Sequence, residues 1–365
     1  MERSVILSMV KMSRIRRSLY SVGLFVCIAL IPQIGRAQPN ELDNLLEQGR
    51  ESVEARNWSS ALEAFQRASA LDNRNARIFS GMGYVFAQQG RFQEAAEAYR
   101  QAVTLEPDNA DFAYALGFSL ANLGNDSAAE TAYRRATELN RRNVNAFLGL
   151  GTVLARQGQV DRALAAYQQA ATLDRRNAAA HESIGLMLIQ QGRVAQGITS
   201  LQTAATLDPR RASTQIGLGI ALLERNDSPG ALAAFNRAVR LDPNNPKLHL
   251  QIGKILREKG NGAEALRAFQ RSVNLDSSSV EAQFALAETA LAQNETMRAV
   301  MTFREVVKLD PNNAYAYYQM GVALKARDFP RDAIEAFETA RKLFEEQGKA
   351  DEMKQAERAI AETKQ

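Results

Sequence analysis

The sequence predicts an all-α protein in which short helix pairs stack side by side into a solenoid. A 34-residue pattern recurs through residues 42–347, and a period of this length is typical of stacked repeat architectures. Within one period, Phe147, Leu150 and Leu154 stand at i, i+3 and i+7, which is one face of a helix. A break at Gly158 then separates this helix from a second apolar face, as expected where glycine ends a helix.

Nine consecutive units carry the pattern. The thirtieth residue is Leu in every unit, and the eighth is Gly in all but one, which has Ala287. The twentieth is Ala except for Gly197, and the twenty-fourth is aromatic except for Leu201. A glycine inside a helix costs about 1 kcal/mol, so its recurrence indicates a close approach of the partner helix, with the aromatic ring beside the crossing. The units are 42–75, 76–109, 110–143, 144–177, 178–211, 212–245, 246–279, 280–313 and 314–347.

This pattern resembles the tetratricopeptide repeat (TPR) family, whose unit has 34 residues and two antiparallel helices. The resemblance covers 306 of the 365 residues and implies a right-handed α-solenoid of about nine helix-turn-helix hairpins. The first and eighth units match the pattern least, the eighth through Ala287 and Ala290. The proline that closes a unit is present only at Pro107, Pro209, Pro243 and Pro311.

Residues 1–37 have the composition of a secretory signal peptide. Three arginines precede an apolar stretch over residues 19–31, and the segment ends on the small residue Ala37. A basic region, a short apolar region and a small-residue end are typical of a signal peptide, and the apolar stretch is short for a membrane span. We therefore expect cleavage after Ala37 and export to a periplasm, a lumen or the extracellular space. The alternative is an uncleaved leader that anchors the protein, the one membrane contact that we expect.

The leader also explains the basic character of the whole chain. The chain has 45 Lys and Arg against 41 Asp and Glu, a formal net charge of +4 and a pI near 9.2. Residues 1–37 contain six of the basic residues and one acidic residue, so 39 basic and 40 acidic residues remain, a net charge of −1. The basic pI therefore gives no support for a nucleic-acid partner. The only cysteine, Cys27, lies in the leader, so the remaining chain offers no thiol.

The two ends of the repeat array have simple predicted roles. Residues 38–41 form a short polar linker, and no further linker is expected before residue 347, so one solenoid domain is predicted. In residues 348–365, Met353, Ala356 and Ile360 stand at helical spacing among charged residues. This spacing is typical of a polar-faced capping helix, which repeat arrays need for solubility.

Sequence motifs indicate no enzyme, since leader, repeats and tail together leave no segment for a catalytic domain. The motif Gly149-Leu150-Gly151 lies inside a predicted helix and follows no strand, so a phosphate-binding loop is disfavoured. His181 and His249 are 68 residues apart and occupy the fourth position of their units, where others carry an aromatic residue. A packing role is favoured over a ligand or a base, and their separation disfavours a shared metal site. We expect no catalytic residue, cofactor or metal.

The candidate functional surface is a groove along the first helices. In the TPR family, ligands usually lie along the concave face that these helices line, at the second, fifth, ninth and twelfth residues by helical spacing. A contiguous apolar patch there usually marks an interaction site; the alternative is that adjacent helices cover these residues, which then only pad the stack. The apolar candidates for partner binding are Tyr114, Phe118, Leu148, Leu186, Ile189, Ile216, Ile220, Leu223, Leu250 and Phe284.

The chemistry of this surface favours an apolar polypeptide segment as the partner. The family's clamp for acidic C-terminal peptides uses Lys and Asn, whereas the fifth positions of the middle units hold Leu148, Glu182 and Ile216. An apolar groove suits an extended or amphipathic segment. We expect a non-enzymatic, exported adaptor that helps to assemble an envelope or membrane-associated complex. Two alternatives stay open: a self-associating structural scaffold, and a non-catalytic subunit that positions a polysaccharide or cell-wall enzyme.

Overall fold

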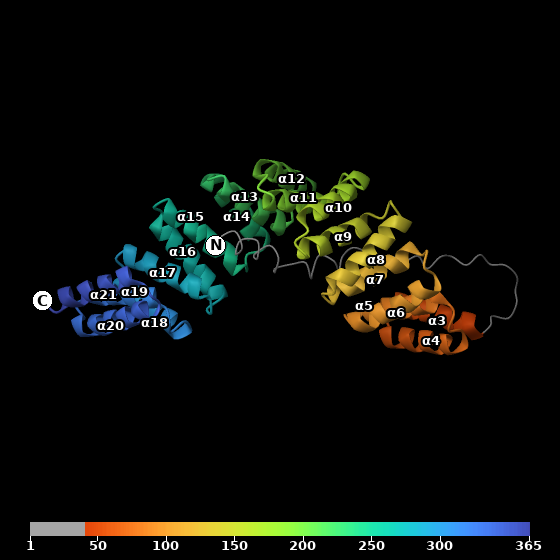
Figure 1. The fold of residues 1–365 in the computed structure, drawn as a ribbon, viewed down its shortest axis with the longest axis horizontal. Coiled ribbons are helices and arrows are strands. Elements are labelled where there is room, and N and C mark those ends of the chain that lie inside the picture. Colours follow the sequence, from red (N-terminus) through yellow and green to blue (C-terminus); the bar gives the residue numbers. More distant parts are fainter. Residues whose placement is uncertain (1–40) are drawn as a thin grey trace. The chain divides into compact units, whose positions relative to one another are not determined.

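The computed structural model describes residues 41–365, and every regular element in this range is an α-helix (Figure 1). The all-α prediction is therefore confirmed. The predicted leader, residues 1–37, and most of the predicted linker lie outside the described residues. The first described helix begins at Glu41, the last residue of that linker. None of the helices in residues 41–365 is both long and apolar enough to cross a membrane.

The described helices cluster into two compact units, which we call the N-terminal unit, up to Pro209, and the C-terminal unit, Arg210–Gln365. The sequence predicted one continuous solenoid domain, and that domain assignment stays a prediction. In the N-terminal unit, each second helix packs on its own first helix, and each except α12 also packs on the first helix of the next repeat in the unit. Its helices are α3 (Glu41–Glu54), α4 (Trp58–Leu71), α5 (Ala76–Gln88), α6 (Phe92–Leu105), α7 (Ala110–Asn122), α8 (Asp126–Leu139), α9 (Val144–Arg156), α10 (Val160–Leu173), α11 (Ala178–Gln190) and α12 (Val194–Leu207).

The C-terminal unit repeats the same helix-pair arrangement and ends on one additional helix. This last helix buries Ala356 and Ile360, two of the three residues that predicted its apolar face, and packs against the helix before it. The helices of the unit are α13 (Ala212–Glu224), α14 (Ser228–Leu241), α15 (Pro246–Glu258), α16 (Gly262–Leu275), α17 (Val280–Ala292), α18 (Thr296–Leu309), α19 (Ala314–Lys325), α20 (Pro330–Glu346) and α21 (Ala350–Thr363).

The recurring glycine and aromatic residue make the core contact within and between repeats. The ring of Tyr133 is 2% exposed, and a Cβ added to Gly117 of the same repeat would lie 2.8 Å from its Cδ1. A Cβ added to Gly149 of the next repeat would lie 2.5 Å from Cζ of the same ring. Both distances are shorter than a carbon–carbon contact at optimal separation, about 3.5–4.0 Å. The aromatic ring therefore joins two consecutive repeats, and only glycine leaves room for it.

The turn inside each helix pair contains one residue in the left-handed region, at the fifteenth position of the unit. Five units place glycine there, with φ between +73° and +80°. Asn226, Asn294 and Asp328 take the same conformation with φ of 59°, 60° and 62°, and their short polar side chains tolerate it. Arg56, at φ 56°, is the one such residue with a long side chain. The glycine breaks in the sequence thus correspond to an actual backbone requirement.

Candidate functional site

The ten candidate groove residues lie on first helices, five in each compact unit. Within a unit, neighbouring first helices contact one another directly, α7 with α9 and α15 with α17. Side chains at the same repeat positions therefore approach each other on one face. The N-terminal unit contributes Tyr114 and Phe118 on α7, Leu148 on α9, and Leu186 and Ile189 on α11; the C-terminal unit contributes Ile216, Ile220 and Leu223 on α13, Leu250 on α15 and Phe284 on α17.

Three of the candidates are buried in the core. Phe118 and Ile220 are each 9% exposed, and Leu250 is 5% exposed. The ring of Phe118 meets the ring of Phe92 edge-on, with centroids 6.1 Å apart, a geometry that aromatic pairs favour. These three side chains serve mainly to pack the helices, and little of their surface is left for a partner.

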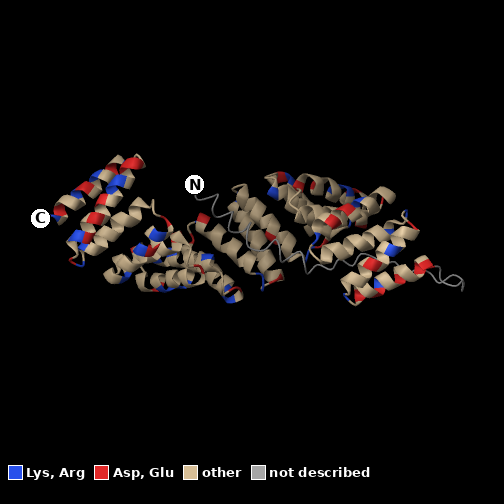
Figure 2. Cartoon of the chain, turned by 90° about the horizontal axis from the view of Figure 1, so that it is seen from below, with Lys and Arg blue, Asp and Glu red and all other residues tan. Residues whose placement is uncertain are grey.

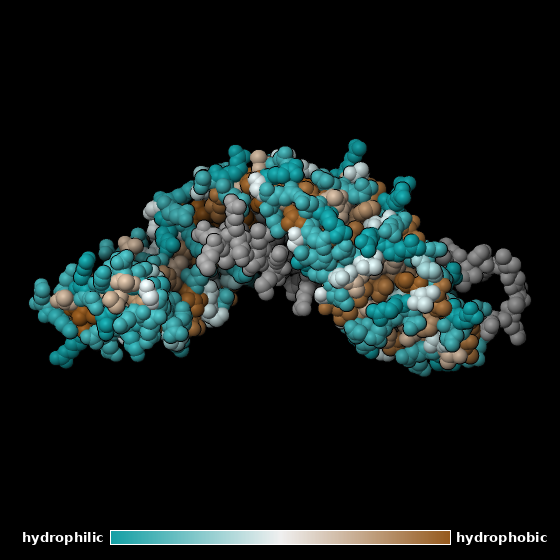
Figure 3. Space-filling model, in the orientation of Figure 1, coloured by the Kyte–Doolittle hydropathy of each residue, from teal (hydrophilic) through white to brown (hydrophobic). Residues whose placement is uncertain are grey.

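The other seven candidates are partly exposed, since one edge packs on the core and the other reaches the surface. The ring of Tyr114 lies 5.9 Å from that of Tyr133, and the ring of Phe284 lies 5.8 Å from that of Phe303. Burial raises the pKa of Tyr114 to about 12, so its hydroxyl stays neutral at physiological pH. Apolar residues also reach the surface over α5 and α7 in the view of Figure 3. The face combines the two roles that the sequence left open, and its role in binding stays a prediction.

In the C-terminal unit, opposite charges on neighbouring first helices pair across this face. Lys254 Nζ on α15 lies 2.6 Å from Glu281 Oε1 on α17, and Arg257 Nη1 lies 3.0 Å from Glu288 Oε2. A third pair joins α19 to α21. The sequence analysis did not predict this pairing. It could have been predicted from the opposite charges at the second, ninth and twelfth positions of consecutive units. Basic and acidic positions are likewise interleaved along the helices in Figure 2.

The fourth position of several units holds a polar side chain that binds the turn before it. His181 and His249 each place Nε2 3.1 Å from the carbonyl oxygen six residues earlier. The amide of Gln283 makes the equivalent bond at 3.3 Å. The imidazoles are therefore engaged with the backbone. Within residues 41–365, no cluster of His, Cys, Asp and Glu is arranged to hold a metal ion.

Comparison with protein families identifies the repeat. A tetratricopeptide repeat model matches residues 114–180, 148–212, 184–246 and 250–314, and a TPR repeat model matches residues 83–124. Together these ranges cover more than half of the chain. The chain belongs to the tetratricopeptide repeat family. TPR proteins generally bind protein or peptide partners, so the family is consistent with a protein-interaction scaffold.

The sequence relative and the solved structures that match this TPR protein each cover only part of it. A TPR repeat-containing protein of Picosynechococcus sp. is 40% identical over 79 residues, which are 21% of this chain and only 20% of that protein. A structure described as the functional characterization of Pseudomonas aeruginosa pilF covers 63% of this chain and 98% of its own, with 21% identity and a TM-score of 0.51. A tetratricopeptide repeat protein from Parabacteroides merdae covers 68% and 98%, with 17% identity and a TM-score of 0.51. At these identities the two structures establish the common fold.

Proposed function

We propose that this TPR protein is an exported, non-enzymatic adaptor that binds an extended or amphipathic segment of another polypeptide. The binding surface is the first-helix face of the N-terminal unit, and the role is the assembly of an envelope or membrane-associated complex. The observation that carries the proposal is the set of partly exposed apolar side chains on three consecutive first helices. These are Tyr114 on α7, Leu148 on α9, and Leu186 and Ile189 on α11.

The physical argument is the contrast between this surface and its neighbours. A side chain that only fills the core is buried, as Phe118 is, whereas Leu148 and Leu186 keep part of their surface in water. Covering that surface with the apolar side of a partner segment is favourable by about 25 cal/mol for each Å² buried. In the C-terminal unit, the partly exposed Ile216, Leu223 and Phe284 share the first-helix face with paired charges, so we place the partner on the N-terminal unit.

The two remaining parts of the proposal have separate support. Export is supported by the pattern of residues 1–37, with its basic region, short apolar stretch and small-residue end. A non-enzymatic role is supported by the helical repeats, which occupy almost all of residues 41–365.

The test is a crosslinking pull-down from the native host with tagged residues 38–365, read by mass spectrometry. We expect one discrete polypeptide partner, which is lost with Leu148→Gln combined with Leu186→Gln. The matched control is Ala165→Gln with Thr199→Gln, which changes two exposed residues on the second helices of the same repeats and should retain the partner. Phe118 and Ile220 are unsuitable targets because both are buried, and a polar group there would destabilise the repeat.

Three outcomes of the pull-down contradict the adaptor proposal. Recovery of the bait crosslinked only to itself indicates a self-associating scaffold. A carbohydrate-active companion that survives the groove substitutions indicates a subunit that positions an enzyme. A partner that both variants retain removes the first-helix face from the binding surface, provided that circular dichroism shows both variants folded.

A further inference from the structure

Two methionines on α18 are exposed outside the first-helix face. Met297 is 49% exposed and Met301 is 61% exposed. They occupy the eighteenth and twenty-second positions of the eighth repeat, one helical turn apart. The other eight repeats have polar, charged, Ala or Pro residues at both positions, for example Arg331 and Glu335 in the ninth repeat. Since the same fold forms without them, the methionines are not a requirement of the repeat.

A third exposed apolar residue departs from the repeat pattern in the same part of the chain. Phe329 is 45% exposed at the sixteenth position of the ninth repeat, where the other eight repeats carry a polar or charged residue. By contrast, the exposed Leu71, Leu241 and Leu309 stand at the thirtieth position, where every repeat has Leu. Of the exposed large apolar residues that depart from the repeat pattern, Leu123 lies in the third repeat, and the others lie in the eighth and ninth repeats: Met297, Met301, Tyr315 and Phe329.

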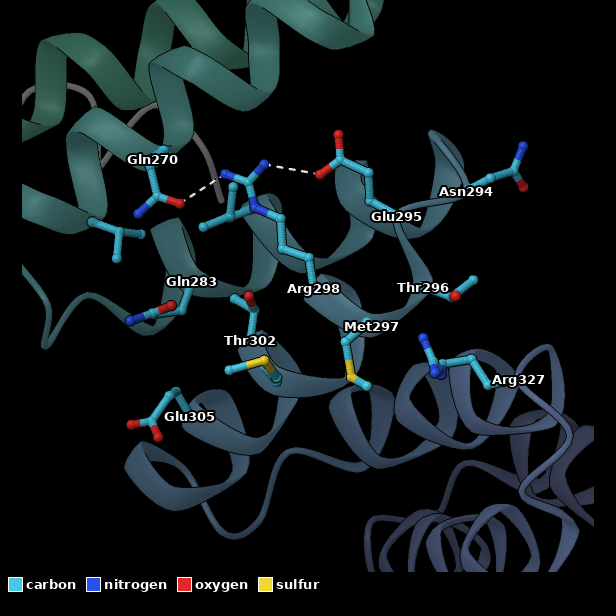
Figure 4. Close-up of a pocket in the computed structure, with 13 residues that line it drawn as sticks. Gln270, Gln283, Asn294, Glu295, Thr296, Met297, Arg298, Thr302, Glu305 and Arg327 are labelled. Atoms are coloured by element: carbon cyan, nitrogen blue, oxygen red, sulfur yellow. Dashed lines mark hydrogen bonds and ion pairs between the residues drawn. The ribbon is translucent and has the colours of Figure 1, made fainter.

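The methionines border an open pocket of about 700 Å³, the α18 pocket, shown in Figure 4. Its walls come from α16, α17 and α18 and from Arg327 in the turn between α19 and α20. Val273 and Leu286, which are 8% and 2% exposed, supply apolar lining. This volume is in the range of roughly 300–1,000 Å³ that ligand pockets in proteins occupy. It can therefore receive more than one bulky side chain.

The charged groups beside the methionines are mostly engaged with each other. Arg298 Nη1 lies 2.9 Å from Glu295 Oε2, and Arg298 Nη2 lies 2.7 Å from Gln270 Oε1, as the dashed lines in Figure 4 show. The carboxylate of Glu305 lies 3.6 Å from Lys308 Nζ. Each of the two acidic side chains that line the pocket, Glu295 and Glu305, therefore has a basic partner.

Arg327 is a cation at the pocket that has no acidic partner within residues 41–365. Its guanidinium carbon lies 5.7 Å from the centroid of the exposed ring of Phe329, which fixes the group beside the apolar surface. Its Nε is buried and has no hydrogen-bond partner within residues 41–365. A buried donor without a partner costs about 1–3 kcal/mol, so an incoming acceptor is favoured. The pocket therefore combines apolar surface from the methionines, Val273 and Leu286 with the positive charge of Arg327.

We propose that the α18 pocket is a second docking site, for a segment of another protein that presents bulky apolar side chains beside a carboxylate. Methionine is flexible and polarizable, so it adapts to apolar side chains of different shape. An arginine guanidinium binds a carboxylate through two parallel hydrogen bonds. The exposed methionines continue the apolar surface along one turn of α18, which suits a polypeptide better than a small molecule held inside the pocket.

This site goes beyond the groove proposal because it lies in the C-terminal unit, on the second helices α16 and α18 with α17 between them. The groove uses first helices of the N-terminal unit, and no residue belongs to both sites. A protein with both surfaces can hold two partners at once. Each site can also fail in its own test while the other stands.

The test selects short random peptides by display on immobilised residues 38–365 and measures the affinity of the selected peptides by fluorescence anisotropy. We expect peptides with apolar residues next to Asp or Glu. Their affinity should fall roughly tenfold or more with Met297→Gln combined with Met301→Gln, and also with Arg327→Gln. Two variants should leave it unchanged: the groove pair Leu148→Gln with Leu186→Gln, and Arg331→Gln with Glu335→Gln at the matched positions of the ninth repeat.

Several results overturn the docking proposal. One is that no selected peptide depends on the two methionines. Another is that replacing the acidic residue of the peptide by its amide leaves the affinity intact, a test of the charge that does not depend on how Arg327→Gln folds. Concentration-dependent self-association that the methionine variant abolishes, measured by sedimentation, assigns the pocket to a second copy of this chain. Circular dichroism of each variant ensures that a loss of affinity is not a loss of fold.

Discussion

Nε2 of His181 lies 3.1 Å from the backbone carbonyl oxygen of Arg175, on the turn that joins two repeats. Because a carbonyl oxygen can only accept, the ring nitrogen carries the proton in this contact. His249 makes the same contact two repeats later. The histidines thus replace the aromatic filler of other repeats with a hydrogen bond to the preceding turn.

Substitution of His181 should separate this hydrogen bond from simple space filling. We expect His181→Phe, which copies the residue of other repeats, to lower the free energy of unfolding by about 0.5–1.5 kcal/mol, the usual contribution of one hydrogen bond. His181→Gln should be close to wild type because Gln283 makes the equivalent bond with its amide. Urea unfolding followed by circular dichroism measures both. Equal stability of the Phe variant and the wild type contradicts the role of the bond.

Gly149→Ala should weaken the junction between the third and fourth repeats. The new Cβ would lie 2.5 Å from Cζ of Tyr133, and overpacking of this kind costs about 1–3 kcal/mol. Alanine also has a higher helix propensity than glycine, which stabilises the folded state by about 1 kcal/mol. We therefore expect a small net decrease in the free energy of unfolding, measured with urea. The control is Tyr133→Leu, which removes the ring carbons that the new Cβ would meet. In the double variant, the decrease in the free energy of unfolding should be smaller than the sum of the two single decreases. Strict additivity would show that the Tyr133 ring does not clash with the new Cβ.

Much of the fold follows directly from repeat positions. The eighth and twenty-fourth residues predict a helix crossing with an aromatic ring beside it, and Tyr133 occupies that place. The glycine breaks predict turns, and residues at that position adopt left-handed backbone. These features are predictable because each depends on contacts within one pair of repeats. The division of the chain after Pro209 depends on how contacts accumulate over many repeats, which no single repeat position encodes.

The candidate site was less predictable than the fold for the same physical reason. The ninth residue of a repeat is buried where it is Phe118 or Ile220. In the seventh repeat the ninth residue is Lys254, which pairs with a charge on the next first helix. The exposure of this position therefore depends on the neighbouring helix. The α18 pocket was not predicted because the groove expected for this repeat lies on the first helices, whereas the two methionines lie on a second helix. Comparison of the eighteenth and twenty-second positions across all repeats would have found Met297 and Met301 in the sequence alone.

Arg56→Gly should stabilise the first repeat. Arg56 has a φ of 56°, and left-handed backbone costs an ordinary L-residue about 1–2 kcal/mol, whereas glycine adopts it freely. Glycine also loses more chain entropy on folding, so we expect a net gain of about 1 kcal/mol. Hydrogen exchange of amides in residues 42–75 measures the gain. Asn226→Gly, read in residues 212–245, is the control and should gain less because Asn tolerates the conformation; equal gains at both sites contradict the explanation.

Two buried tyrosines at the same repeat position should respond oppositely to loss of the hydroxyl. The hydroxyl of Tyr99 is buried and has no hydrogen-bond partner among the described residues, whereas that of Tyr167 lies 3.2 Å from Thr152 Oγ1. Removing an unsatisfied group relieves a cost of about 1–3 kcal/mol, while removing a bonded one loses about 0.5–1.5 kcal/mol. We therefore expect Tyr99→Phe to raise the midpoint of urea unfolding and Tyr167→Phe to lower it. A loss of stability in both variants would contradict the difference in bonding.

The N-terminal unit should be the first part of the protein to unfold at alkaline pH. Burial raises the pKa of Tyr99, Tyr133 and Tyr167 above the ordinary value for tyrosine, which is about 10. A raised pKa in the folded state means that stability is constant below pH 10 and falls above it, by about 1.4 kcal/mol for each tyrosine and pH unit. The C-terminal unit has phenylalanine at all four equivalent positions. Its Tyr315, whose pKa is raised by a hydrogen bond to Glu352, is exposed and not part of the core.

The single tryptophan makes this difference between the units measurable in the intact chain. Trp58 lies in the N-terminal unit, with its ring edge-on to Tyr84 at 6.5 Å, so its emission wavelength reports on that unit alone. As the pH rises above 10, we expect the emission maximum to shift to the red while far-ultraviolet circular dichroism retains a large part of the helical signal. Replacing the three buried tyrosines by phenylalanine should move the emission transition to higher pH. Coincident transitions by both probes, or an unchanged transition in the triple variant, would show that tyrosine ionisation does not control alkaline unfolding.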